Sequence, residues 1–196
     1  MKKAIIQFKK WHFTKMLVGL SFMVFLFSQC EIQKSYEYEY SQSAGGKLGI
    51  TAWQYVQTTD SLSLMAQAIT ASGMQDYYSG TNEYTFIVPR NSAFRSYMKT
   101  NKYASISAIP VATLQSMLGY HIVKAKVLFS DPALLLANNP IEYETVSGQV
   151  MYLSRNTSYQ GLINQGTKKS WTIITSNLEP TNGVIHVTDA IVYLSL

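Results

Sequence analysis

Apolar residues between positions 49 and 120 recur at intervals of three or four, which is the spacing of one helix face. The clearest face lies in Ser61–Ser72, where we expect Asp60 to be the N-cap and Gly73 the C-cap. Further helices are predicted at Ala52–Gln57, from Asn91 as N-cap to about Lys99, and at Val111–Leu118 with Pro110 at N1 and Gly119 closing it.

The pattern changes after Tyr120 to alternation of apolar and polar residues, which is typical of strands. The predicted strands are His121–Val123, Lys126–Phe129, Ile141–Val146, Val150–Arg155, Thr172–Thr175, Val184–Thr188 and Ala190–Leu194. An earlier strand, Tyr84–Val88, is ended by Pro89, and a short helix begins at Asp131-Pro132 and runs to about Ala137. The predicted helices come mostly before the predicted strands, and this order is typical of an α+β fold.

The first thirty residues have the features of an export signal. Lysines run to Lys15, and Met16–Phe27 is a nearly unbroken apolar segment. Its length suits a signal peptide and falls short of the roughly 20 residues that span a bilayer. Cys30 is the only cysteine, so it cannot form an intramolecular disulfide, and its position resembles that of the lipidated cysteine in a bacterial lipobox.

We therefore expect a lipoprotein signal peptide in residues 1–30, a flexible tether in 31–48 and one folded domain in 49–196. The expected location is a bacterial outer membrane or cell surface, reached by export and held by lipid on Cys30. The alternative is ordinary secretion, with Cys30 in the discarded peptide.

The net charge of +5 comes from the N-terminus. Five of the 16 basic residues lie in residues 1–30 without an acidic one, which leaves 11 basic against 11 acidic residues in 31–196. A neutral body lacks the basic excess that phosphate backbones attract, so nucleic acid is not an expected partner.

Near the end of the chain, Asn182-Gly183 predicts a tight turn before a strand. His186 lies on one face of that strand, whereas Asp189 would fall on the opposite face. A histidine among apolar strand residues is more often a hydrogen-bonded core residue than a catalyst, and His121 has a similar setting.

Four blocks of the chain resemble, in order and spacing, the signature blocks of fasciclin-like (FAS1) domains. The matching positions are Phe86, Pro89, Asn91 and Phe94; Tyr120 and His121; Thr145 and Gly148; and Asn182, Gly183, His186 and Asp189. The resemblance covers about residues 49–196. It implies a single fasciclin-like domain with N-terminal helices packed on a mostly antiparallel β-wedge or sandwich.

The resemblance also implies adhesion or binding rather than an enzyme, with no catalytic residue, metal or cofactor expected. In animal members, adhesion is attributed to the Tyr-His region, which corresponds to Tyr120 and His121, and burial decides whether these residues bind or support the core. Asn177-Leu178 stands where those members have an Asp-Ile pair, so a cation-coordinating acid is missing. The expected partner is an extracellular or envelope protein or glycan, and we expect a monomer.

Two other classes stay open at the level of sequence. The many Tyr, Phe and Met residues suit a carrier of a small apolar ligand, which would need a closed apolar pocket. An envelope hydrolase would need His186 or His121 in a cleft with acids or an activated serine.

Overall fold

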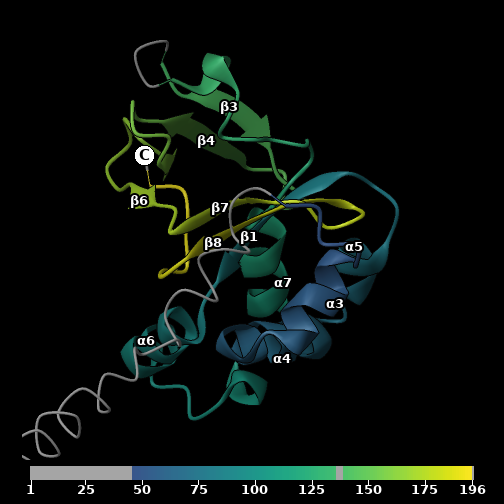
Figure 1. The fold of residues 1–196 in the computed structure, drawn as a ribbon. Coiled ribbons are helices and arrows are strands. Elements are labelled where there is room, and N and C mark those ends of the chain that lie inside the picture. The colour runs from purple at the N-terminus through teal and green to yellow at the C-terminus, as the bar shows by residue number, and fades with distance from the viewer. Residues whose placement is uncertain (1–45, 136–138, 196) are drawn as a thin grey trace, which may run out of the picture. The chain divides into compact units, whose positions relative to one another are not determined.

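The chain folds into helices on one side of a sheet and a second sheet on the other side (Figure 1). This computed structural model describes residues 46–135 and 139–195. The predicted signal peptide, Cys30 and most of the tether lie outside the described residues. Residues 46–48, at the end of the predicted tether, lie beside Glu179, whose carbonyl accepts a hydrogen bond from the Leu48 amide (2.9 Å).

The first sheet has the strand order β2-β1-β8-β7. Its strands are β1 (Tyr84–Pro89), β2 (Ile122–Val123), β7 (Thr175–Leu178) and β8 (Gly183–Thr188). β1 and β8 are parallel and aligned from the Tyr84–Gly183 pair to the Pro89–Thr188 pair, whereas the other neighbours are antiparallel. The early strand and the last predicted motif strand therefore form the centre of this sheet.

The second sheet is antiparallel, with the order β3-β4-β5-β6. Its strands are β3 (Ile141–Glu144), β4 (Val150–Arg155), β5 (Gly161–Ile163) and β6 (Trp171–Thr172). The predicted hairpin between β3 and β4 is confirmed, with Gly148 at φ +80° in its turn.

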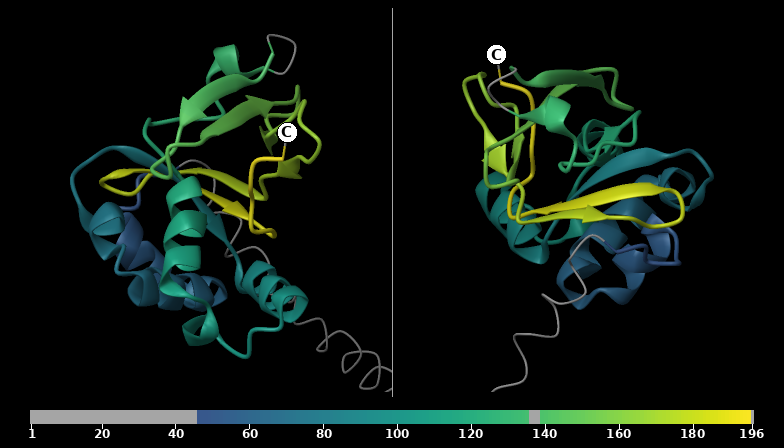
Figure 2. Two further views of the ribbon diagram at one scale, coloured as in Figure 1. Left: turned by 180° about the vertical axis from the view of Figure 1, so that it is seen from behind. Right: turned by 45° about the horizontal axis from the view of Figure 1, so that its top comes forward.

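The helices cover the face of the first sheet that lies away from the second sheet (Figure 2). They are α3 (Ala52–Thr58), α4 (Ser63–Ser72), α5 (Gln75–Ser79), α6 (Asn91–Asn101) and α7 (Val111–Tyr120), with short 3₁₀ helices at Asp60–Leu62, Ile106–Ala108 and Pro132–Leu134. The predicted α+β architecture of helices on a mostly antiparallel β-structure is confirmed.

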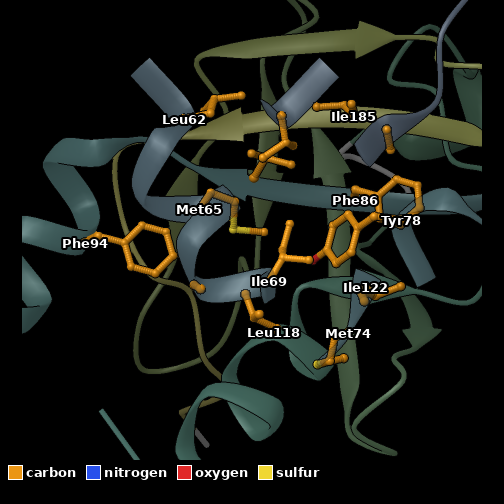
Figure 3. Close-up of a cluster of buried hydrophobic side chains, with 14 of the residues drawn as sticks. Leu62, Met65, Ile69, Met74, Tyr78, Phe86, Phe94, Leu118, Ile122 and Ile185 are labelled. Carbon is orange, nitrogen blue, oxygen red and sulfur yellow. The ribbon is translucent and has the colours of Figure 1, made fainter. Parts of the chain in front are cut away.

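Alternate residues of the two central strands face two different cores. Phe86 and Ile185 belong to the core under the helices, where Phe86 stacks on Tyr78 with ring centroids 4.8 Å apart (Figure 3). Ile87 belongs to the core between the sheets, together with Leu153 and Ile163. Because successive side chains of a strand point to opposite faces of the sheet, the two central strands contribute residues to both cores.

Several predicted helix ends are wrong in detail. Asp60 begins a 3₁₀ turn rather than capping the long helix, and α4 starts only at Ser63. Pro110 is the N-cap of α7 rather than its first helical residue, and Gly119 lies inside α7, because the helix continues to Tyr120. The prediction of Gly73 as C-cap is confirmed by its φ of +71°.

Two predicted strands, Lys126–Phe129 and Ala190–Leu194, do not form because side chains occupy their backbone groups. The Val127 amide donates to Thr85 Oγ1 and the Phe129 amide to Asn177 Oδ1, both at 2.8 Å. In the last segment the Val192 amide donates to His121 Nε2 at 3.1 Å. These segments therefore join the fold through side chains instead of a strand ladder.

The predicted strand Thr172–Thr175 is divided between the two sheets. The Ile173 amide bonds to the carbonyl of Gly161 in β5, and the Ile174 amide bonds to that of Val187 in β8. The chain thus leaves one sheet and enters the other within two residues, which ends β6 and starts β7.

Candidate functional site

His121 is fully buried at the junction of α7 and β2, and both of its ring nitrogens make hydrogen bonds. Nδ1 donates to the Met117 carbonyl at 2.8 Å, and Nε2 accepts from the Val192 amide at 3.1 Å. Burial lowers the pKa of His121 to about 4, although the bond to Met117 opposes the shift. His121 therefore fastens the C-terminal segment to α7 and is inaccessible to a partner in the folded domain.

His186 has the same character in the opposite half of the sheet. Its Nδ1 accepts from the Asn177 amide at 3.1 Å, and its Nε2 donates to the Val127 carbonyl at 3.0 Å. The ring is fully buried against Phe129, and burial lowers its pKa to about 4 despite the bond to Val127. Because the His186 ring is neutral and both of its nitrogens are hydrogen-bonded within the fold, it is not available as a general base. This agrees with its predicted role as a hydrogen-bonded core residue.

Asp189 lies apart from this histidine. Its carboxylate is exposed, 3.9 Å from the Arg90 guanidinium, and accepts a hydrogen bond from Ser92 Oγ at 3.4 Å. The structure therefore does not bring His186 and Asp189 together, in agreement with their predicted places on opposite faces.

The two motif asparagines hold helices that are distant in the sequence. Asn91 Oδ1 accepts from the Leu64 amide at 2.8 Å, so Asn91 caps α4 instead of α6, the helix it was predicted to cap. Asn182 Oδ1 accepts from the Ala52 amide, and its Nδ2 donates to the Tyr78 carbonyl, both at 2.8 Å. Both side chains satisfy helix-end groups that would otherwise lack partners.

The other motif residues have packing roles. Phe86 and Phe94 are fully buried, and Pro89 ends β1 beside Thr188. Gly183, at φ +139°, has the Tyr84 carbonyl oxygen only 1.9 Å from the place where a Cβ would stand. A side chain at this position would therefore push β1 and β8 apart.

Tyr120 is almost fully buried, and its hydroxyl belongs to a network centred on Asn164. Asn164 Nδ2 donates to the Tyr120 hydroxyl and to the Tyr193 carbonyl, both at 2.9 Å. Asn164 Oδ1 accepts from the Tyr152 amide at 3.1 Å, while the Tyr120 hydroxyl lies 3.2 Å from the Val150 carbonyl that can accept its proton. Burial raises the pKa of Tyr120, so the hydroxyl keeps its proton.

Sequence reasoning did not identify Asn164. It is buried at φ +54° between β5 and the following turn, and its partners lie in α7, β4 and the C-terminal segment. No local periodicity marks such a residue, because each partner is distant in the sequence.

Two hollows, both open to solvent, are lined in part by residues of the C-terminal segment 189–193. One, of about 560 Å³, is lined by Tyr120 and by residues of α7 and the C-terminal segment, including Met117 and Tyr193. The other, of about 330 Å³, is lined by Trp171, Gln165 and Ile174 among others. Of the predicted binding pair, only Tyr120 thus borders one of these two hollows.

Residues 46–135 and 139–195 contain neither a cluster of potential metal ligands nor a membrane-spanning helix. Within these ranges, no group of three or more His, Cys, Asp or Glu side chains is placed to hold a metal ion. In the same residues, no helix has the length and apolar character needed to cross a bilayer.

Comparison with known proteins agrees with the geometry. A family model of the fasciclin domain matches residues 60–193. Among solved structures, the chain is similar to a FAS1 domain pair from the insect cell adhesion molecule fasciclin I, with 16% identity and a TM-score of 0.61. The match covers 74% of this chain and 51% of that one, so the chain spans about half the length of the pair. No curated protein matches the chain in sequence. On the strength of the family match, this chain belongs to the fasciclin domain family.

Proposed function

We infer that this protein is a lipid-anchored module of the cell envelope that acts in adhesion or in binding a macromolecule. Residues 1–30 would be the lipoprotein signal, Cys30 the lipidated residue, and 31–48 the tether. Family membership supports an adhesive role, since the similar solved structure comes from a cell adhesion molecule.

One structural observation carries the binding part of this proposal. The histidines and asparagines of the family blocks direct their polar atoms to the protein's own backbone, as seen for His121, His186, Asn91 and Asn182. Because these groups stabilise the fold, recognition falls to exposed side chains and hollows around them. Adhesion needs such a surface and requires no reactive group.

The anchor is tested by expressing the full chain and its Cys30→Ser variant in a bacterium fed a labelled fatty acid. We expect label and membrane retention in the natural chain, and loss of both in the variant, because the thiol is the acylation site. Ser28→Ala is the matched control and should keep both. Membrane retention that is unchanged in Cys30→Ser, with no label in the natural chain, would refute the anchor.

The binding role is tested separately with arrays of glycans and envelope or matrix proteins probed with the full Cys30→Ser chain. Saturable binding to a defined class supports the proposal. Silence across both arrays would overturn the adhesive role and leave the anchor unaffected.

A further inference from the structure

Trp171 and Tyr193 form an aromatic ridge with Lys169 at the edge of the second sheet. The two rings meet edge to face, with centroids 5.0 Å apart. Lys169 Nζ lies 5.6 Å from the Trp171 centroid and 5.0 Å from that of Tyr193, and it donates to the Tyr193 hydroxyl at 2.8 Å. Trp171 is half-buried and Tyr193 is 47% exposed, so the ridge presents ring surface to solvent.

The ridge is held rigidly by the turn before β6. The Thr167 hydroxyl lies 2.9 Å from the carbonyl oxygens of both Asn164 and Lys169 and donates its one proton between them. The Lys168 amide bonds to the Ser195 carbonyl at 3.0 Å, which ties the turn to the C-terminal segment beside β6 (Figures 1 and 2). These bonds restrain the backbone of the turn before a ligand binds, and such preorganisation favours affinity.

The lining of the adjoining hollows combines ring faces with hydroxyl and amide groups. Trp171 and Gln165 line the smaller hollow beside Ser170 and Thr172, and Tyr193 lines the larger one with Ser116 and Gln149. A sugar ring has an apolar C–H face and a rim of hydroxyls, so it matches an aromatic surface flanked by hydrogen-bonding side chains. A hollow adjoins each of the two rings, which suits a ligand longer than a single sugar.

The charge at the ridge is positive and unneutralised. Lys168 and Lys169 are exposed neighbours, and neither forms an ion pair with any residue in the described ranges. Asp189, which lines the smaller hollow, lies near the Arg90 guanidinium. Two ammonium groups without a carboxylate partner, beside ring faces and hydrogen-bonding side chains, favour a sugar ligand that carries anionic groups such as carboxylates.

An anionic membrane fits these features less well. Polybasic membrane sites use clusters of about four to eight Lys or Arg residues, whereas the ridge has two. Amide-lined and hydroxyl-lined hollows also contribute little to contact with a bilayer surface.

We propose that the ridge of Trp171, Tyr193, Lys168 and Lys169 binds an acidic polysaccharide, with sugar rings against the aromatic side chains and carboxylates at the lysines. This rests on the proposed role of the protein as a binding module of the cell envelope. The protein would then attach its cell to a uronate-containing matrix.

The test measures binding of the full chain, purified in detergent, to alginate, a polymer of uronic acids. Carboxyl-reduced alginate and dextran are the matched uncharged probes. We expect alginate to bind about tenfold or more tightly than its reduced form, and Lys168→Ala/Lys169→Ala to remove that preference. Trp171→Ala should weaken binding to both forms about tenfold, whereas Lys99→Ala and Tyr159→Ala should match the natural chain.

Equal binding of alginate and dextran, or no binding of alginate, would overturn the proposal. So would binding to phosphatidylglycerol vesicles, in place of alginate, that the Lys168→Ala/Lys169→Ala variant loses, because a lipid on Cys30 would hold both chains on vesicles alike. The double lysine variant keeps the test decisive if Trp171→Ala fails to fold, because both lysines are exposed. Failure here, with fatty-acid labelling of Cys30 and array binding intact, would remove the polysaccharide and leave the proposed function.

Discussion

Tyr78 and Tyr120 are buried tyrosines with opposite hydrogen-bonding states. The Tyr78 hydroxyl has no partner among the described residues, and burial raises its pKa strongly, whereas the Tyr120 hydroxyl is bonded to Asn164. Tyr78→Phe removes an unsatisfied polar atom and should leave the free energy of unfolding unchanged or raise it by up to about 1 kcal/mol. Tyr120→Phe leaves Asn164 and Val150 short of a partner and should lower it by about 1–2 kcal/mol.

Urea unfolding of the two variants beside the natural chain measures this difference. The two substitutions delete the same atom, so each is the chemical control for the other. Equal losses of stability in both would contradict the assigned networks.

His121 and His186 should make the domain sensitive to mild acid. Each has its pKa lowered from 6.5 to about 4 in the fold, so the unfolded chain binds protons that the native state rejects. Their stabilisation is complete above pH 6.5 and is lost as the pH falls towards 4, with a total of about 3 kcal/mol for each histidine. The steepest loss is about 1.4 kcal/mol per pH unit for each residue.

Urea unfolding between about pH 7.5 and pH 5 would measure this slope in a range where most carboxylates stay ionised. His186→Gln removes one titrating group and should reduce the slope, even though the variant is less stable at every pH. A stability that does not vary over this range would contradict the neutral buried state of both rings.

At the scale of elements, α4 depends on a residue of another helix. Asn91 accepts from the Leu64 amide and donates to the Asp60 carbonyl and Ser63 Oγ. Asn91→Ala should therefore lower the free energy of unfolding by about 1–2 kcal/mol. Asn91→Asp keeps the acceptor for Leu64 and should recover part of that loss.

Ser92→Ala is the neighbouring control for thermal and urea unfolding. Ser92 is exposed and makes one long bond to Asp189, so the expected cost is below about 0.5 kcal/mol. If Asn91→Ala lowered the free energy of unfolding no more than Ser92→Ala does, the capping of α4 by Asn91 would not contribute to stability.

The contact between β1 and β8 depends on Gly183. Gly183→Ala places a Cβ 1.9 Å from the Tyr84 carbonyl oxygen, so we expect loss of the folded, soluble protein. Gly166 also has a positive φ, of +88°, yet among the described residues no atom outside Gly166 and its two chain neighbours lies within 4 Å of the place that a methyl group would take there. Gly166→Ala should therefore cost only the backbone strain, about 1 kcal/mol, in the same solubility and melting assays. Equal behaviour of the two alanine variants would contradict the close approach of the strands.

Local periodicity accounts for the elements that sequence predicted well. The α4 face and the β4 alternation depend on residues a few positions apart, and both elements lie close to their predicted ranges. Lys126–Phe129 and Ala190–Leu194 have the same alternation but form no strands, because Thr85, Asn177 and His121 take their amide groups. A sequence pattern shows which face of a segment is apolar. It cannot show which distant side chain will accept a hydrogen bond from a backbone amide of that segment.

The candidate site likewise contains residues whose role could be predicted from sequence and residues whose role could not. The burial of His121 and His186 follows from the apolar residues around them, so their core role could be predicted. Trp171 and Tyr193 come from segments about twenty positions apart and meet only through the fold. The ridge therefore had no signal in the sequence.

At the scale of the whole molecule, the two central strands come from early and late parts of the domain. β1 begins at Tyr84 and pairs with β8, which begins at Gly183, and residues of β1 reach both cores. Such pairing between distant segments must overcome the entropy of closing a long loop before it gains contacts, so folding should be slow.

This pairing affects when the growing chain can fold. A growing chain that lacks Gly183–Thr188 has a β1 without its parallel neighbour, and the core under the helices is incomplete. We therefore expect the domain to stay unfolded until β8 has been synthesised. If the chain is exported as proposed, the late position of β8 would keep it unfolded, and so able to pass through a translocation channel, until synthesis is nearly complete.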